Sequence, residues 1–412
     1  MKTFIKKYSS KKKLLSFSMF LIAFILPFEK TTIRYALVIF LTLYFFYGDY
    51  KELLNKKKWW LLSLTILWIL PFIQLLLFQK IDVYWSSLMT KLSLLILPII
   101  IIITSGYHKI NISKTLFFFT IGCILSAAFC GLFAIFNYYF LVNENAFKYA
   151  SISVFHHPGY FTMYLNFSIA LLYYNLLKPE TDYHVNRKWS VVIISLLTFF
   201  ILIASSRTGW VTNILIQLFF ISTLLVRKKL NSKFFIYFLL LSIPFSTTIY
   251  FNKTIKSRFQ EVIMNTTSSE NSKKIRSSTS VRKKIWKTSF ELIKKKWLFG
   301  YGTGIGKKKL ENQYEKEGYI YLHQKKYNTH NQYLQFFIDH GIIGLLILIF
   351  FTFGMIIISL KQKKYIYTLF LVIIIINFMT ESILETQSGV IFFAFFNTIF
   401  FYDCFNNKNL AF

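Results

Sequence analysis

Two arginines and one histidine stand where their side chains could do chemistry. Arg207 lies in a short polar stretch between two apolar runs, and Arg282 lies near the start of an amphipathic segment at 279–298. His330 lies where a long polar segment gives way to another apolar run. An arginine offers a phosphate two parallel charge-assisted hydrogen bonds, and a histidine near neutral pH can act as a general base. These residue types indicate an anion-binding site with a base.

Each of these residues also has a plain structural explanation. Arg207 could extend its charge from a helix end to the membrane surface, and Arg282 is one of 19 basic residues in the segment 252–331. A lone histidine is more often structural than catalytic. The locations of the two arginines favour a functional role. The connection that carries Arg207 is short, so its charge stays close to the membrane, where ionisable groups are costly. Arg282 falls in the first turn of its predicted helix, where free backbone N–H groups also attract phosphate.

The glycine-rich stretch Gly300–Gly306 resembles a nucleotide-binding loop, but its spacing excludes that function. A P-loop needs glycine where the chain has Tyr301 and a hydroxyl residue where it has Lys308. We therefore predict a tight turn after the amphipathic helix.

No set of side chains predicts a metal or an organic cofactor. His156 and His157 are adjacent, so on a helix they point apart, and no carboxylate pair lies near them. Glu381 and Glu385 are one helical turn apart, but no histidine lies beside them in the sequence. We therefore expect no catalytic metal and no cofactor.

The composition indicates the class of protein that positions these residues. Of 412 residues, 55% are hydrophobic and only 16% are charged, and the mean hydropathy is +0.49. A soluble protein carries about 25% charged residues, so the composition excludes a soluble multidomain enzyme and indicates an all-helical, polytopic membrane protein. The net charge of +31 then reflects Lys and Arg in loops, and we expect no nucleic-acid partner.

Apolar runs divide the chain into about twelve candidate membrane spans, some of them at or below the usual length of a span. The predicted spans are 14–28, 33–47, 59–78, 86–104, 115–140, 158–177, 189–205, 209–226, 234–251, 332–360, 365–380 and 388–405. This gives three parts: nine spans in 1–251, a long loop at 252–331 that contains an interfacial helix at 279–298, and three spans in 332–412.

The distribution of Lys and Arg in the short connections predicts the orientation of the chain. With the N-terminus in the cytoplasm, the cytoplasmic segments hold 23 of these residues and the short outer segments hold 6. Both termini are therefore predicted to be cytoplasmic, and the loop 252–331 to lie outside. Arg207, Arg282, His330, Glu381 and the histidine pair at 156–157 then share the outer face.

Four local motifs resemble the O-antigen ligase/O-antigen polymerase superfamily, which are membrane glycosyltransferases that use lipid-linked oligosaccharides. The motifs are Ser206–Gly209, Arg282–Gly304, the histidine motif His330–Gly344 and the polar stretch Glu381–Gln387. The predicted topology, with one long outer loop before the last three spans, is also similar to that of the family.

The resemblance implies a site in a bacterial inner membrane that faces the periplasm. Its donor would be a glycan on undecaprenyl pyrophosphate, and Arg207 and Arg282 would bind the pyrophosphate. His330 would deprotonate or orient an acceptor hydroxyl, with Asn331 and Glu381 as further substrate-binding residues. Two guanidiniums can neutralise the leaving group without a metal, and attack opposite it would invert the anomeric centre.

Three functions remain open at this point. A ligase would transfer the glycan to an acceptor such as lipid A core, and a polymerase would transfer it to another lipid-linked repeat unit. A transporter or flippase is the alternative from another class, but it would show internal repeats and charges at the midplane of the membrane. The polar residues gather instead at one predicted face, which favours an enzyme.

Overall fold

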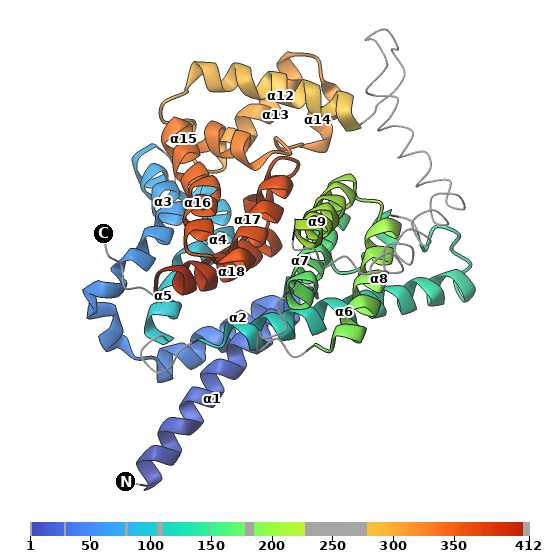
Figure 1. Cartoon of the computed structure of the whole chain (residues 1–412). Coiled ribbons are helices and arrows are strands. Elements are labelled where there is room, and N and C mark those ends of the chain that lie inside the picture. The colour runs from blue at the N-terminus through green and yellow to red at the C-terminus, as the bar shows by residue number, and fades with distance from the viewer. Residues whose placement is uncertain are drawn as a thin grey trace. The chain divides into compact units, whose positions relative to one another are not determined.

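The computed structural model describes residues 2–28, 30–78, 81–104, 110–147, 149–177, 185–226 and 278–406. Every regular element in these residues is a helix, which confirms the predicted all-helical class (Figure 1). The chain forms two compact units. The first comprises Met1–Tyr47 and Tyr107–Thr267, and the second comprises Gly48–Gly106 and Ser268–Phe412.

The first unit is a bundle of apolar helices. Its described elements are α1 (Lys2–Ile25), α2 (Lys30–Tyr47), α6 (Ile112–Tyr139), η3 (Tyr149–Ser151), α7 (Pro158–Leu177), α8 (Arg187–Ile203) and α9 (Arg207–Val226). Small residues allow close helix crossings, since a Cβ on Gly122 of α6 would lie 2.2 Å from the carbonyl oxygen of Phe24. Asn166 of α7 donates a hydrogen bond to the Gly209 carbonyl of α9, so a buried amide also joins these two helices.

The second unit contains the remaining described helices. They are η1 (Tyr50–Leu54), η2 (Lys56–Thr65), α3 (Ile66–Phe78), α4 (Ile81–Thr90), α5 (Ser93–Thr104), α12 (Ser278–Lys295), α13 (Ile305–Lys316), α14 (Ile320–Lys325), α15 (Gln332–Ile349), η4 (Phe350–Gly354), α16 (Met355–Lys361), α17 (Tyr365–Phe378), η5 (Ile383–Glu385) and α18 (Gln387–Asn406). Helix α18 is nearly all buried and packs its phenylalanines against α17, as in the contact of Phe370 with Phe392.

Six helices in the described residues are long and apolar enough to cross a membrane. They are Lys58–Leu77, Trp85–Thr104, Ile112–Tyr139, Arg207–Val226, Gln332–Lys361 and Gln387–Asn406. Four shorter apolar helices are Lys13–Ile25, Thr32–Tyr47, Lys188–Ile203 and Tyr365–Phe378. The membrane character is thus supported, whereas the count of about twelve spans stays a prediction, and the predicted span 234–251 lies outside the described residues.

Three predicted spans differ from continuous α-helices, and the first of them, 59–78, begins in the 3-10 helix η2 and continues as α3. The span 86–104 is interrupted by a turn at Lys91, where the Lys91 N–H donates to Leu88 O (3.0 Å) and the Leu94 N–H donates to Lys91 O (2.9 Å). These bonds to the third residue back are tighter than those of an α-helix. The span 332–360 contains a kink at Gly341, whose φ of 65° is non-helical, and a π-helical turn at η4.

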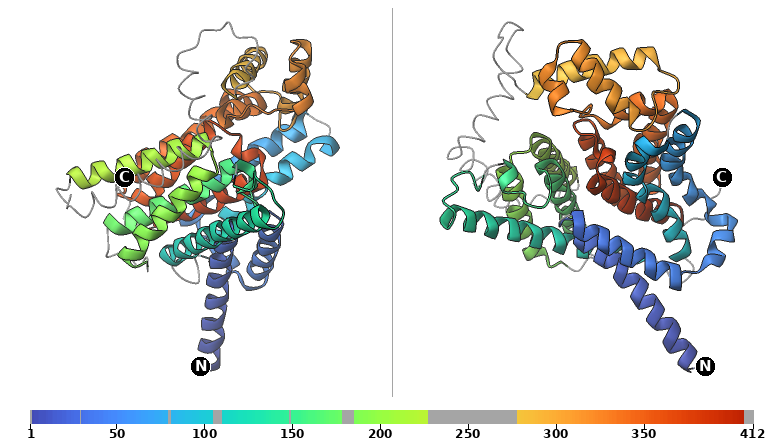
Figure 2. Two further views of the ribbon diagram at one scale, coloured as in Figure 1. Left: turned by 90° about the vertical axis from the view of Figure 1, so that its right-hand side faces the viewer. Right: turned by 180° about the vertical axis from the view of Figure 1, so that it is seen from behind.

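Helices α12, α13 and α14 form a small subdomain with a core of its own. Figures 1 and 2 show them grouped at one end of α15. The buried residues of this core are Ile285, Leu292, Leu310, Tyr314 and Leu322. Much of the apolar face of the predicted interfacial helix therefore packs on protein. The helix ends at Lys295, and α13 and α14 were not predicted from the sequence.

The predicted glycine turn is present, and it docks into the kink of α15. Tyr301 N–H donates to Ile338 O (2.8 Å), and Ile342 N–H donates to Trp297 O (2.8 Å). These bonds replace the pairing of Ile342 N–H with Ile338 O that a continuous α-helix would make. A Cβ on Gly341 would lie 2.1 Å from the Leu298 carbonyl oxygen, so this close approach requires glycine.

A candidate active site around Glu381

Glu381 joins the two residues of the second unit that the sequence predicts to be catalytic. Its Oε1 accepts a hydrogen bond from Nη2 of Arg282 at 3.1 Å, and its Oε2 lies 3.0 Å from Nδ1 of His330. The three side chains are 22–28% exposed, so they are partly sheltered yet open to a ligand. The structure thus brings together three of the five predicted site residues as an Arg–Glu–His cluster.

Arg282 is held at the start of α12 by two contacts with one loop. Besides its ion pair with Glu381, its Nη2 donates to the carbonyl oxygen of Thr380 at 3.0 Å. One turn further along α12, Trp286 donates from Nε1 to the carbonyl oxygen of Thr329 at 3.0 Å. Helix α12 is therefore fixed both to the loop that carries Glu381 and to the residue before His330.

His330 has a left-handed backbone conformation, with φ of 46°, which is uncommon for a residue other than glycine. Its backbone N–H donates to Oδ1 of Asn328 at 3.0 Å. Asn331 accepts from Leu334 N–H at 3.0 Å and so caps α15, while its Nδ2 donates to Met379 O at 3.2 Å. Strained backbone of this kind often marks functional sites. Asn331, predicted to bind substrate, makes contacts that position the histidine.

The loop that carries Glu381 is anchored by buried polar groups. Ser382 Oγ lies 3.1 Å from Thr329 Oγ1, and Leu384 N–H donates to Oε1 of Gln332 at 2.6 Å. Both partners lie next to or near His330 in the sequence. The carboxylate and the imidazole are consequently held by the same small network, which limits their relative motion.

The contact with Glu381 indicates which nitrogen of His330 carries a proton. A carboxylate accepts hydrogen bonds, so Nδ1–H is the donor, and Nε2 of the neutral ring keeps a lone pair. The tautomer is assigned from this partner. Such a histidine can take a proton at Nε2, while the carboxylate stabilises the imidazolium that forms, as in other carboxylate–histidine pairs.

Arg207 belongs to the first unit, where it is the first residue of α9. Ser206 Oγ accepts a hydrogen bond from Gly209 N–H at 3.2 Å and caps this helix, and Ser205 has a φ of 52°. Arg207 is partly exposed. Its predicted part in pyrophosphate binding stays a prediction.

The histidine pair at 156–157 and Glu385, which the sequence analysis also considered, lie among structural contacts. In the first unit, His157 Nδ1 accepts from Gly159 N–H at 3.3 Å at the start of α7, and its Nε2 lies 3.2 Å from the Tyr149 hydroxyl. In the second unit, Glu385 forms an ion pair of 2.7 Å with Lys91, whose side chain is completely buried. The sequence analysis missed this pair, although a lone lysine inside an apolar run is a signal for it.

His340, ten residues after His330, lies inside α15 and is completely buried. Its Nδ1 pairs with Oε1 of Gln74 from α3, and its ring packs against Phe336 at 4.7 Å between centroids. Within the described residues, no three His, Cys, Asp or Glu side chains form a group that could hold a metal ion.

Comparison with protein families identifies residues 191–349 as a match to the family model described as O-antigen ligase. The match contains the motifs around Arg207, Arg282 and His330, and it confirms the resemblance noted from the sequence. Glu381 lies beyond the matched segment. No curated protein matches the chain.

Proposed function

We propose that the chain is a membrane glycosyltransferase that uses a lipid-linked glycan, and the match of residues 191–349 to the O-antigen ligase family model supports this proposal. The donor is a glycan on undecaprenyl pyrophosphate, and the acceptor is a sugar hydroxyl, with lipid A core as the leading candidate. The observation that carries this proposal is the cluster of Arg282, Glu381 and His330.

In the proposed reaction, His330 activates the acceptor. The hydroxyl proton passes to Nε2 of His330 as the hydroxyl oxygen attacks the anomeric carbon. The bond from that carbon to the pyrophosphate oxygen breaks, and its electron pair stays on the pyrophosphate. Attack opposite the leaving group inverts the anomeric centre. Glu381 acts on the other nitrogen of the ring, where it stabilises the positive charge.

Arg282 and Arg207 neutralise the leaving pyrophosphate in this proposal. Arg282 uses Nη2 for Glu381 and Thr380, and a guanidinium has five N–H donors, so others remain for a phosphate. Charge stabilisation in a water-poor site is often the largest contribution to catalysis, and here it needs neither a metal nor a cofactor. Arg207 supplies the second guanidinium.

The membrane arrangement proposed here follows the distribution of basic residues. Both termini face the cytoplasm of a bacterial inner membrane, and the α12–α14 subdomain with His330 faces the periplasm. The apolar candidate membrane spans offer the polyprenyl chain of the donor a surface to lie on.

A gene deletion distinguishes a ligase from a polymerase. We expect the deletion strain to lose the glycan ladder attached to its acceptor, while chains of normal length accumulate on the lipid carrier. Products of a single repeat unit would indicate a polymerase. A normal surface glycan, with no change on the carrier, would contradict both, and accumulation of donor on the cytoplasmic face would indicate a flippase.

A further inference from the structure

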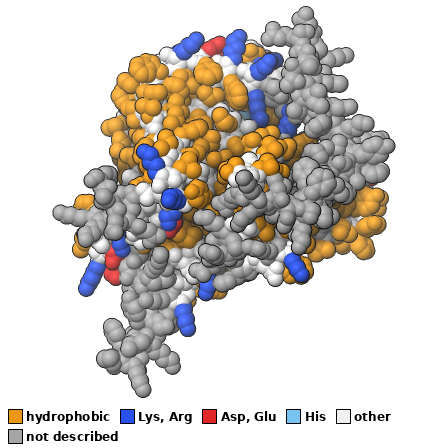
Figure 3. Space-filling model, in the orientation of Figure 1, with side chains coloured by type: hydrophobic (Ala, Val, Ile, Leu, Met, Phe, Trp, Pro, Cys, Tyr) orange, Lys and Arg blue, Asp and Glu red, His pale blue; other side chains and the backbone are white. Residues whose placement is uncertain are grey.

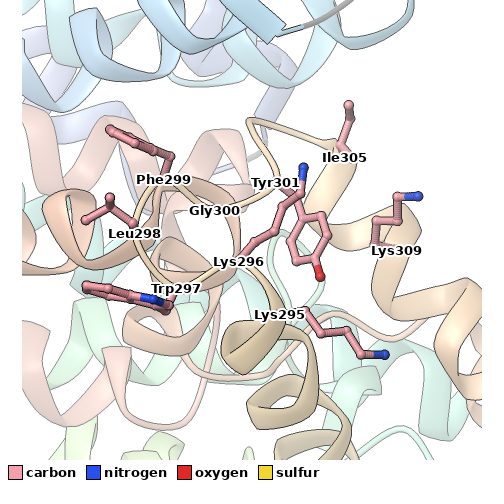
Figure 4. A pocket seen from close by; sticks show the side chains of 9 residues that line it. All are labelled: Lys295, Lys296, Trp297, Leu298, Phe299, Gly300, Tyr301, Ile305 and Lys309. Atoms are coloured by element: carbon pink, nitrogen blue, oxygen red, sulfur yellow. The ribbon is translucent and has the colours of Figure 1, made fainter.

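A cavity of about 510 Å³ lies at the far end of α12 from the candidate active site. It is formed by the C-terminal end of α12, the glycine turn and the start of α13, and it includes Lys295 and Lys309 (Figure 4). Arg282 lies thirteen residues from Lys295 along the same helix, which corresponds to about 20 Å. The cavity is therefore separate from the Arg–Glu–His cluster.

Apolar and basic side chains are segregated around this cavity. Figure 4 shows Trp297, Leu298 and Phe299 on one side and Lys295 and Lys309 on the other. Lys296 lies between them, with its Nζ 5.4 Å from the centre of the Tyr301 ring. Trp297 is 56% exposed and Phe299 is 53% exposed, although large aromatic side chains are normally covered in a soluble subdomain.

The apolar side of the cavity is hydrogen-bonded to two candidate membrane spans. Gln74 donates to the Phe299 carbonyl at 2.9 Å, and Gln74 is three residues, about 4.5 Å, from the end of the span Lys58–Leu77. Trp297 O accepts from Ile342, which lies ten residues inside the span Gln332–Lys361. The exposed aromatic residues are thus fixed beside residues of two candidate spans, within reach of acyl chains, and Trp is enriched where those chains meet the headgroups.

The basic side has no acidic counterpart. None of the residues that line the cavity is acidic. Among the residues that the structure describes, no carboxylate forms an ion pair with Lys295, Lys296 or Lys309, whereas nearby Lys307 pairs with Glu311 at 3.8 Å. Figure 3 shows further Lys and Arg side chains over the α12–α14 end of the molecule. Three cations beside exposed aromatic residues, next to candidate membrane spans, match an anion that carries an acyl chain.

We propose that this cavity binds the headgroup of an anionic phospholipid, whose phosphate contacts Lys295, Lys296 and Lys309 and whose acyl chains contact Trp297 and Phe299. The lysines also complement the negative end of the α12 dipole, but that role does not require a cavity or exposed aromatic residues. The bound lipid holds the C-terminal end of α12 at the bilayer.

The test uses the full-length protein in phosphatidylcholine nanodiscs that contain increasing fractions of phosphatidylglycerol with brominated acyl chains. Bromine quenches a tryptophan that it contacts, and the difference between the wild type and Trp297→Phe isolates the signal of Trp297. We expect strong quenching at a low fraction of brominated phosphatidylglycerol and weak quenching by the same fraction of brominated phosphatidylcholine.

Two variants with equal charge changes test the lysines. The triple variant K295Q/K296Q/K309Q should need about 100-fold more phosphatidylglycerol for half of the quenching, since each of the three lysines near the surface contributes about fivefold. The control K283Q/K287Q/K308Q removes three exposed lysines of the same two helices outside the cavity and should bind like the wild type. Equal thermal unfolding midpoints establish that both variants are folded.

Four results would overturn the proposal. Equal quenching by both brominated lipids would mean that Trp297 contacts acyl chains without selecting a headgroup. Equal losses of quenching by phosphatidylglycerol in both triple variants would mean a diffuse basic surface. Relief of quenching by excess inorganic phosphate means a site for a free anion, and relief by a trace of undecaprenyl pyrophosphate means a donor site. No glycan donor or acceptor is added, so failure here leaves the proposed glycosyl transfer untouched.

Discussion

The carboxylate of Glu381 lies 3.0 Å from Nδ1 of His330, although the two residues are 51 positions apart in the sequence. The same carboxylate binds Arg282 through its other oxygen at 3.1 Å. One acidic side chain therefore fixes the orientation of the proposed base and of one proposed anion ligand. Glu381 acts in this arrangement as a positioning residue.

Replacing Glu381 tests this relationship. Glu381→Gln keeps the shape of the side chain but loses the negative charge that stabilises the imidazolium, so turnover should fall by about 100-fold or more. Steady-state kinetics with a lipid-linked donor should show the loss in kcat. Glu315→Gln is the matched control, because Glu315 is exposed on α13, and it should leave kcat unchanged.

A double variant tests whether Glu381 and His330 act as a unit or independently. If Glu381 acts through His330, H330A/E381Q should be about as slow as His330→Ala alone, because residues that act as a unit are non-additive. Losses that multiply would show that the carboxylate has a separate role.

Replacing His330 and replacing His340 should have opposite effects on activity and stability. His330→Ala should lower turnover by about 100- to 10,000-fold with little change in unfolding temperature, since the side chain is 26% exposed. His340→Ala should destabilise the protein by about 2 kcal/mol or more, because it removes a buried ring and leaves Oε1 of Gln74 without its partner. Thermal unfolding in detergent and single-turnover assays measure the two effects. If His340→Ala were stable but inactive and His330→Ala were active, His330 would not be the general base.

Arg282 should not be replaceable by lysine. Arg282→Lys keeps the charge but loses the planar guanidinium that contacts Glu381 and Thr380 and can bind a phosphate through two parallel hydrogen bonds, so most activity should be lost. Lys283→Ala should have little effect on the rate, because Lys283 is exposed and its charge is screened by salt. Comparable small losses at both positions would mean that Arg282 is an ordinary residue of a basic surface.

The proposed orientation can be tested with reporter fusions. Reporters fused near residues 55, 230 and 363 should indicate the cytoplasm, and one near residue 270 should indicate the periplasm, because basic residues favour the cytoplasmic side. A cytoplasmic signal at residue 270 would reverse the proposed face of the active site.

Sequence analysis identified Arg282, His330 and Glu381 as separate candidates but could not predict their contact. Local spacing predicts faces of helices, whereas the Glu381–His330 pair depends on how the loop after α17 meets the start of α15. The glycine turn was predictable because glycine allows positive φ, but its partner, the kink at Gly341, was not. Helices α13 and α14 were missed because their many lysines conceal the few apolar residues, such as Leu310 and Tyr314, that form the core.

The buried ion pair of Lys91 and Glu385 supports a last prediction. Lys91 is completely buried and Glu385 is 19% exposed, so Lys91→Met leaves a largely buried carboxylate without its partner. Breaking such a pair costs up to about 3–5 kcal/mol, and less where water reaches the carboxylate. We therefore expect a clearly lower unfolding temperature, and lower activity as well, because Glu385 lies four residues after Glu381.

Two further variants test whether the lost stability comes from the unpaired buried charge. K91M/E385Q removes both charges and should recover most of the lost stability, since replacing both partners of a buried pair is often nearly neutral. Lys364→Met breaks a more exposed pair, in which Lys364 lies 2.6 Å from Asp403, and it should cost about 1 kcal/mol or less. If Lys91→Met and Lys364→Met had equal, small effects on unfolding, the buried Lys91–Glu385 pair would contribute no more to stability than a partly exposed pair.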